Sequence, residues 1–288
     1  MTTSTSNSIE IDGFPLRYVV KGQGTPMLII GSSLYDERNF SNELTKDFQL
    51  IFLDHRGFVA PNVLEKVEKH YELDVILNDI ALAAKKLNLQ KFIICGHSGH
   101  AFLALEYAKE HQDQVIGVVL IGAAPSNSDA RRQVCYEFFM NHASADRKDK
   151  FFRDWSTVEE RIALTPEKRF AIMCLAAGAQ SWYDYNFDAS FMWDGVYTNM
   201  PIIDHLWGVA FRDIDITDGL KNFNLPVFLG LGGHDYLTGL PQLWNDLLEK
   251  FQNIDVHVFE KSGHNPHYEE PTSFNKTLLD WKHKIYSR

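Results

Sequence analysis

Cysteine is scarce in this chain. The 288 residues contain three, at positions 95, 135 and 174, and no two of them form a Cys-x-x-Cys pair. An odd number with this spacing argues against a disulfide framework and against a zinc site, so we expect no bound metal and a reducing compartment, the cytoplasm. With 45% hydrophobic residues, a chain of this length buries enough apolar surface to fold without either kind of cross-link.

Long apolar segments and an excess of basic residues are also missing. The strongly apolar run at residues 116–124 is far shorter than the ~20 residues that span a bilayer, and the first residues lack the pattern of a signal peptide. The 28 basic residues against 38 acidic ones give a formal net charge of -10. This balance argues against nucleic acid and membrane as partners. We expect a monomer or homodimer whose partner is a small neutral or cationic molecule.

The chain does have a repeated alternation of apolar runs and helical segments. Apolar runs without polar alternation occur at residues 27–30, 48–53, 92–95, 115–121, 227–231 and 256–259. Such runs are typical of strands that are covered on both faces, as in a parallel sheet. Apolar residues at three- and four-residue spacing predict amphipathic helices at 74–87, 99–111, 241–251 and 271–286. Residues 9–20 predict an opening hairpin around Asp12-Gly13.

The alternation is interrupted between residues 125 and 218. No strand-like run occurs there, and charged helical patterns with many aromatic residues take its place. We therefore predict an α/β fold with a mostly parallel central sheet flanked by helices. Residues 1–124 and 219–288 would form this core, and residues 125–218 an inserted helical cap, or lid.

The segment around Ser98 is the most informative one for chemistry. A predicted buried strand runs directly into a predicted helix through Gly96-His97-Ser98-Gly99. A tight corner of this kind needs small neighbours because the serine backbone is strained, and it exposes the hydroxyl at the carboxyl edge of the sheet. The N–H of Gly99 would lie at a helix N-terminus, where it can stabilise an oxyanion. Alone, a Gly-x-Ser turn is equally consistent with an ordinary strand-to-helix connection.

Two further predicted strands end near residues that would complete a catalytic site. Asp235 follows the run at 227–231, and His264 follows the last predicted strand in a Ser-Gly-His sequence. The carboxyl ends of parallel strands meet at one edge of the sheet, so both side chains are expected beside Ser98. Taken singly, Asp235 could be a turn or capping residue and His264 one of 12 histidines. The order Ser, Asp, His, each after its own strand, is far more specific.

These segments resemble the α/β-hydrolase superfamily over about residues 9–286. Within that superfamily they are distantly similar to the esterase and proline-iminopeptidase-like branch. The Ser98 turn is similar to the nucleophile elbow, Gly-Gly-His-Asp to the acid turn, and Ser-Gly-His-Asn-Pro to the histidine loop. The resemblance implies a serine hydrolase that cleaves a small carboxylic ester or related acyl substrate through an acyl-enzyme. Ser98 would be the nucleophile, His264 the general base and Asp235 the acid that orients it. No cofactor is implied.

Two positions depart from the family pattern. The family usually keeps a small residue two positions after the nucleophile, whereas this chain has His100, which is either accommodated structurally or directed into the site. The first loop has Ser32-Ser33 where the family commonly shows His-Gly. By position, the N–H of Ser33 rather than that of Ser32 is expected to join Gly99 in the oxyanion hole. Ser32 and His100 are expected among the substrate-binding residues.

The aromatic side chains of the cap are expected to roof the pocket, and we select Trp182, Tyr185, Phe191 and Trp193 as substrate-binding candidates. The acidic cap residues are expected to be solvated: Asp184, Asp188, Asp194 and Asp204. If one of them faces inward, a cationic amine becomes the alternative substrate, as in proline iminopeptidases, although their His-Gly-Gly-Pro-Gly loop is absent. A second alternative is a small-molecule receptor or signalling protein that retains the triad.

Overall fold

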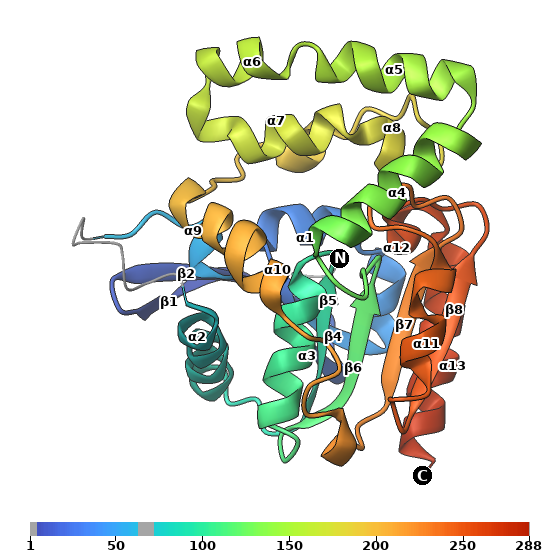
Figure 1. Ribbon diagram of the computed structural model, residues 1–288. Helices are drawn as coiled ribbons and strands as arrows, with labels where there is room; N and C mark the ends of the chain where they lie inside the picture. The colour runs from blue at the N-terminus through green and yellow to red at the C-terminus, as the bar shows by residue number, and fades with distance from the viewer. Residues whose placement is uncertain (1–4, 63–71, 288) are drawn as a thin grey trace.

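An eight-stranded sheet forms the centre of the protein (Figure 1). The computed structural model describes residues 5–62 and 72–287. The strands are β1 (Thr5–Ile11), β2 (Phe14–Lys21), β3 (Thr25–Gly31), β4 (Phe48–Asp54), β5 (Phe92–His97), β6 (Val115–Ile121), β7 (Val227–Gly232) and β8 (Ile254–Phe259). Their spatial order is β1-β2-β4-β3-β5-β6-β7-β8. The pairs β1/β2 and β2/β4 are antiparallel, and the others are parallel.

The predicted strands and the opening hairpin are confirmed. Every residue of β5 and of β7 is buried, as expected for strands with helices on both faces. In the hairpin, Asp12 and Gly13 both have positive φ, of 47° and 81°. This backbone pattern matches a two-residue turn whose twist fits the flanking strands, and it explains the Asp-Gly pair.

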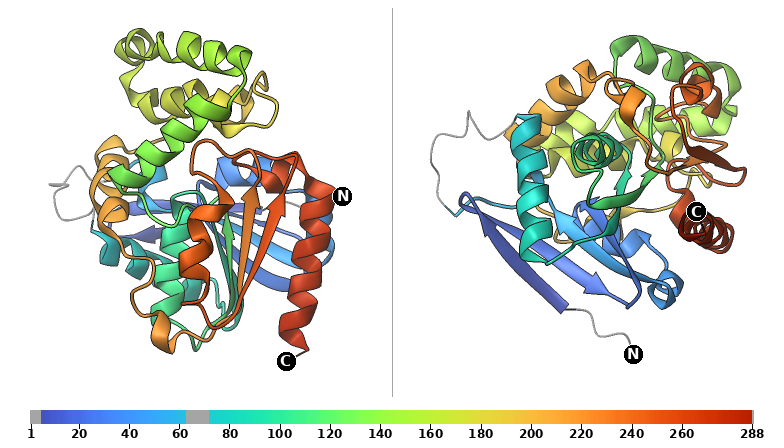
Figure 2. Two further views of the ribbon diagram at one scale, coloured as in Figure 1. Left: turned by 45° about the vertical axis from the view of Figure 1, so that its right-hand side comes forward. Right: turned by 90° about the horizontal axis from the view of Figure 1, so that it is seen from below.

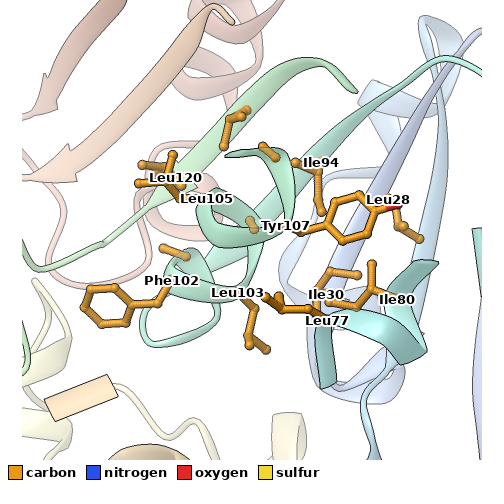
Figure 3. Packing of buried hydrophobic residues seen from close by; sticks show 14 of the residues in the cluster. Leu28, Ile30, Leu77, Ile80, Ile94, Phe102, Leu103, Leu105, Tyr107 and Leu120 are labelled. Carbon is orange, nitrogen blue, oxygen red and sulfur yellow. The ribbon is translucent and has the colours of Figure 1, made fainter. Parts of the chain in front are cut away.

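Helices cover both faces of the sheet (Figure 2). The core helices are α1 (Ser33–Asn39), α2 (Leu73–Lys86), α3 (His100–Glu110), α11 (Asn245–Leu248), α12 (Pro266–Glu269) and α13 (Pro271–Tyr286). Figure 3 shows α3 against the sheet, with Leu103 and Leu105 among side chains from β3, β5 and β6. Both leucines are fully buried, and each such side chain contributes about 1.5–3 kcal/mol. This packing holds the first residue of α3 directly beyond β5.

Between β6 and β7 the described chain forms helices and no strand. They are α4 (Asp129–His142), α5 (Ala145–Trp155), α6 (Val158–Leu164), α7 (Arg169–Ala176), α8 (Gly178–Ser181), α9 (Met200–His205) and α10 (Phe211–Asp213), with a π-turn η6 (Leu206–Ala210). Figure 1 shows α4 to α8 above the carboxyl ends of the strands. The predicted fold class is confirmed: a mostly parallel sheet with flanking helices and an inserted helical cap. None of the helices in the described ranges is long and apolar enough to cross a membrane.

Short 3-10 turns complete the described chain: η1 (Asn42–Lys46), η2 (Arg56–Phe58), η4 (Pro166–Lys168), η5 (Ser190–Trp193), η7 (Leu220–Asn222) and η8 (Pro241–Trp244). The helix predicted at 241–251 was therefore too long. It begins as η8, continues as the four-residue α11, and ends before Phe251. Pro241 suits the first position of such a segment, but the buried Trp244 and Phe251 are the residues that anchor it to the sheet.

Candidate active site

Ser98 occupies a strained corner between β5 and α3. Its φ is 58°, a conformation that a non-glycine residue adopts rarely and usually where function requires it. The local sequence makes the corner possible, because a side chain at Gly96 would collide with the carbonyl of His100. The Ser98 side chain lines a cavity beneath the cap, and so do Gly99 and His264. Ser98 therefore lies at the end of β5, beside this cavity.

Asp235 and His264 lie together at the same edge. His264 Nδ1 donates to Asp235 Oδ2 at 2.8 Å, and both side chains are more than nine-tenths buried. Asp235 Oδ1 accepts the N–H groups of Leu237 and Thr238, each at 2.9 Å, and the Thr238 hydroxyl also donates to the carboxylate. Burial alone would raise the pKa of Asp235, but His264 and the Thr238 hydrogen bonds outweigh it and lower that pKa. The lowered pKa favours the anionic form of Asp235, which accepts the His264 Nδ1–H.

The loop that carries His264 is held from three directions. His97 Nε2 donates to the His264 carbonyl at 2.9 Å, and the His264 N–H donates to the Ser181 carbonyl of the cap at 2.6 Å. Glu269 accepts the N–H groups of Gly263 and Asn265 at 2.9 and 3.2 Å. These bonds restrict the position of the imidazole. His97 was not selected from the sequence, because the Gly-x-Ser pattern of the Ser98 turn sets no requirement on the residue before the serine.

The oxyanion prediction needs one correction. The N–H of Gly99 lies at the first turn of α3, and Gly99 lines the cavity as expected. Ser33 does not line it: the residue is fully buried, and its N–H donates to Asp54 Oδ1 at 2.5 Å. The prediction that Ser33 is the second donor is therefore wrong in this structure. Ser32 does line the cavity, but its N–H donates to Asp36 Oδ2 at 2.9 Å.

His100 reaches the cavity wall but has no free donor to offer. His55 Nδ1 accepts the Gly57 N–H at 3.0 Å, so its proton is on Nε2, which lies 3.1 Å from His100 Nε2. His100 Nε2 is thus an acceptor, and its other nitrogen donates to the backbone of His97. Burial and the neighbouring His55 hold the pKa of His100 well below its usual value, so the ring is neutral. Its edge contact with Trp207, at 5.3 Å between ring centroids, makes it part of an apolar wall.

The cavity itself is large and mostly aromatic. Its volume is about 750 Å³, and it runs from Ser98 to the side chains of α4, α5 and α7. Of the predicted cap residues, Trp182 and Trp193 line it. Tyr185 and Phe191 were also selected but do not line it. Tyr185 stacks instead on the Arg147 guanidinium at 5.0 Å, and the Phe191 side chain is 43% exposed to solvent.

Several residues of the wall were not selected from the sequence. They are aromatic and come from the core loops as well as the cap: Phe58, Phe102, Tyr136, Phe151, Phe152, Trp155, Phe170, Trp207 and Tyr236. The cap is rich in aromatic residues throughout, so its composition alone does not separate the wall from the packing between helices.

Charged groups contribute little to the described lining. Asp36 is its one acidic residue, and none of the four acidic cap residues weighed above is part of it. Arg131 is engaged by the carbonyls of Ser126 and Leu237 and by the side chain of Asn127. Arg132 pairs with Asp129 on the solvent side. Within the described ranges, no three His, Cys, Asp or Glu side chains are grouped to hold a metal ion.

Comparison with known proteins gives consistent matches. A family model for the alpha/beta hydrolase fold matches residues 24–271. The AB hydrolase superfamily protein YclE of Bacillus subtilis (strain 168) is 43% identical over 94% of this chain and 96% of its own. Proline iminopeptidase of Heyndrickxia coagulans is 24% identical and matches over 92% of each chain. The structure of an esterase from Exiguobacterium antarcticum shares the fold, with a TM-score of 0.67, 19% identity and coverage of 96% and 99%.

Proposed function

Because this chain belongs to the α/β-hydrolase fold family, we propose that it is a serine hydrolase that cleaves carboxylic esters through an acyl-enzyme at Ser98. The observation that carries the proposal is the strained Ser98, which lines the same cavity as a histidine whose Nδ1 is bound by a buried carboxylate. Residues 1–124 and 219–288 are the core in this proposal, and residues 125–218 are the lid over the site.

The mechanism follows from the weakness of a neutral serine hydroxyl as a nucleophile. His264 Nε2 removes the hydroxyl proton as Ser98 Oγ attacks the ester carbonyl, and Asp235 stabilises the imidazolium that forms. The Gly99 N–H donates to the oxyanion. The tetrahedral intermediate then collapses, and His264 returns the proton to the departing alcohol. Water, activated by the same histidine, releases the acid and regenerates Ser98.

The cavity wall supports a neutral, apolar substrate. An ester with an aryl group or a long alkyl chain would contact the aromatic side chains, which are favourable partners for apolar surface. A terminal amine would need an ionised carboxylate, and Asp36 is the one acidic group in the described lining. Burial raises the pKa of Asp36 to about 8, so this carboxyl is mostly uncharged at neutral pH. An ester is therefore favoured over a prolyl peptide.

Substrate panels test this choice. We expect turnover of p-nitrophenyl acetate, butyrate and octanoate, and at least 100-fold lower kcat/KM for proline p-nitroanilide, a loss that corresponds to about 2.7 kcal/mol. The Ser98→Ala variant should hydrolyse none of the esters above the buffer rate. Faster cleavage of the anilide would select the iminopeptidase alternative. Absence of turnover on every panel would contradict the proposal and favour a receptor that retains the triad.

Trp193 is expected to determine substrate preference. It lines the cavity and packs on Tyr35 and Phe170, at 4.6 and 5.7 Å between ring centroids. Trp193→Ala should lower kcat/KM for the octanoate ester about 10-fold relative to the acetate, because the longer chain loses apolar contact. Phe191→Ala is the matched control, since Phe191 is on the same turn but outside the cavity. Equal effects of the two variants would show that Trp193 only supports the lid.

A further inference from the structure

The N–H groups at the start of the loop beside the nucleophile are engaged by carboxyls. β3 pairs with β5 so that Ile30 is opposite Gly96, which brings the loop that follows β3 next to the Ser98 corner. The two N–H groups that this loop would offer, those of Ser32 and Ser33, donate to the carboxyls of Asp36 and Asp54. A serine hydrolase normally provides more than one donor to its oxyanion. A side chain near this loop is therefore a candidate for the second donor.

Asp36 is placed to be that group. The residue is 3% exposed and lines the same cavity as Ser98 and Gly99. Its Oδ2 accepts the Ser32 N–H, whereas Oδ1 has no hydrogen-bond partner among the described residues and is not one of the fully enclosed polar atoms. The carboxyl thus has one oxygen with a hydrogen-bond partner and one that keeps accessible surface, in a residue that lines the cavity. Capping α1 requires only the oxygen that accepts the Ser32 N–H, so the other oxygen is available to a bound molecule.

The surroundings of Asp36 determine its protonation. Its pKa is raised to about 8, mainly by burial and also by the charge of Asp54 at the end of β4, against the lowering effect of the Ser32 N–H. Facing it are Tyr35 on its own helix, Cys95 on β5 and His100 on α3, whose pKa values all favour their neutral forms. Arg17 on β2 is directed to Ser33 and to Asp54. No cation therefore compensates Asp36.

We propose that Asp36 acts as a neutral carboxylic acid whose Oδ1–H donates to the substrate carbonyl oxygen, as the second oxyanion donor beside the Gly99 N–H. Its carbonyl oxygen Oδ2 keeps the Ser32 N–H, and its hydroxyl faces the reacting group. As an anion, the same carboxylate would repel the developing oxyanion, so the role requires the protonated form. The inference rests on the proposed ester hydrolysis at Ser98.

The test compares Asp36→Asn and Asp36→Ala with the wild type, as kcat and KM for p-nitrophenyl butyrate from pH 6 to 10 after subtraction of buffer hydrolysis. An asparagine amide accepts the Ser32 N–H and donates to the substrate without ionising. We expect Asp36→Asn to stay within about 10-fold of the wild type at pH 7, and Asp36→Ala to lose about 100- to 1000-fold in kcat with little change in KM.

The pH profile separates this role from a structural one. Wild-type kcat/KM should fall above about pH 8 as the carboxyl ionises, and this alkaline loss should be absent in Asp36→Asn. Asp54→Asn is the matched control: it should keep the alkaline loss, moved to lower pH because a charge that raises the Asp36 pKa is gone. These profiles need only folded protein, which thermal melting verifies for each variant.

Three outcomes would overturn the inference. Asp36→Ala within threefold of the wild type would leave only a capping role, and a faster Asp36→Ala would mean that the carboxyl obstructs the Ser32 N–H. An alkaline loss that persists in Asp36→Asn would assign the titration to another group. Absence of turnover by the wild type would instead contradict the proposed function, so the two failures are distinguishable.

Discussion

Asp235→Asn is expected to lower kcat for p-nitrophenyl esters by about 10⁴-fold. His264 Nδ1 donates to Asp235 Oδ2 at 2.8 Å. The carboxylate also accepts hydrogen bonds from the N–H groups of Leu237 and Thr238 and from the Thr238 hydroxyl. An amide at this position presents an N–H to the imidazole in place of an acceptor, so His264 adopts the tautomer that cannot take the Ser98 proton. KM should change little, because Asp235 is behind His264 and outside the cavity wall.

The neighbouring His234 provides the control. Its ring packs against Tyr183 at 4.9 Å between centroids and is not part of the cavity lining. His234→Asn should keep kcat within threefold of the wild type. Because Asp235 also accepts two turn N–H groups, thermal melting should verify that Asp235→Asn is folded at the assay temperature. A folded Asp235→Asn with kcat within 10-fold of the wild type would contradict the role of Asp235.

Asp79→Ala is expected to destabilise the protein by about 3–5 kcal/mol. Asp79 on α2 accepts Arg56 Nε at 2.6 Å and a terminal guanidinium nitrogen at 2.5 Å, and both residues are essentially inaccessible to solvent. Removing the carboxylate leaves the Arg56 charge buried without this bidentate partner, although it still lies over the Phe14 ring. Arg56 is the first residue of η2, the short turn that follows β4.

Equilibrium urea unfolding measures this effect. Asp213→Ala is the control, since Asp213 forms a comparable bidentate contact with Arg212 that is exposed to solvent. Solvent screens that pair, so its loss should leave the unfolding midpoint unchanged. Equal unfolding midpoints for Asp79→Ala and Asp213→Ala would contradict the prediction. They would show that other groups stabilise the buried Arg56 charge as well as Asp79 does.

The strands and the Ser98 corner could be predicted because burial dictates them. A strand between two layers of helices must be apolar at every position, and β5 and β7 follow that rule without exception. Gly96 is required by the approach of the α3 backbone, so it marks the corner in the sequence itself. The placement of Asp235 and His264 followed from the single edge at which parallel strands end.

The loop after β3 could not be predicted by the same reasoning. Which way the N–H groups of Ser32 and Ser33 point depends on two carboxyls, one on α1 and one at the end of β4. The position of a residue in a family pattern does not predict which nearby carboxyl will accept its backbone N–H. The cap posed a different problem: Phe191 and Trp193 are two residues apart in one 3-10 turn, and only the packing of that turn determines which ring faces the cavity.

Covalent labelling tests the central claim most directly. The wild type and Ser98→Ala should be treated with a fluorophosphonate probe, and the adduct located by mass spectrometry of the intact protein and of its peptides. The account predicts one adduct per wild-type chain, on the peptide that contains Ser98, and none on Ser98→Ala. An adduct on another residue of the wild type, or labelling that persists in folded Ser98→Ala, would contradict the assignment of Ser98 as the nucleophile.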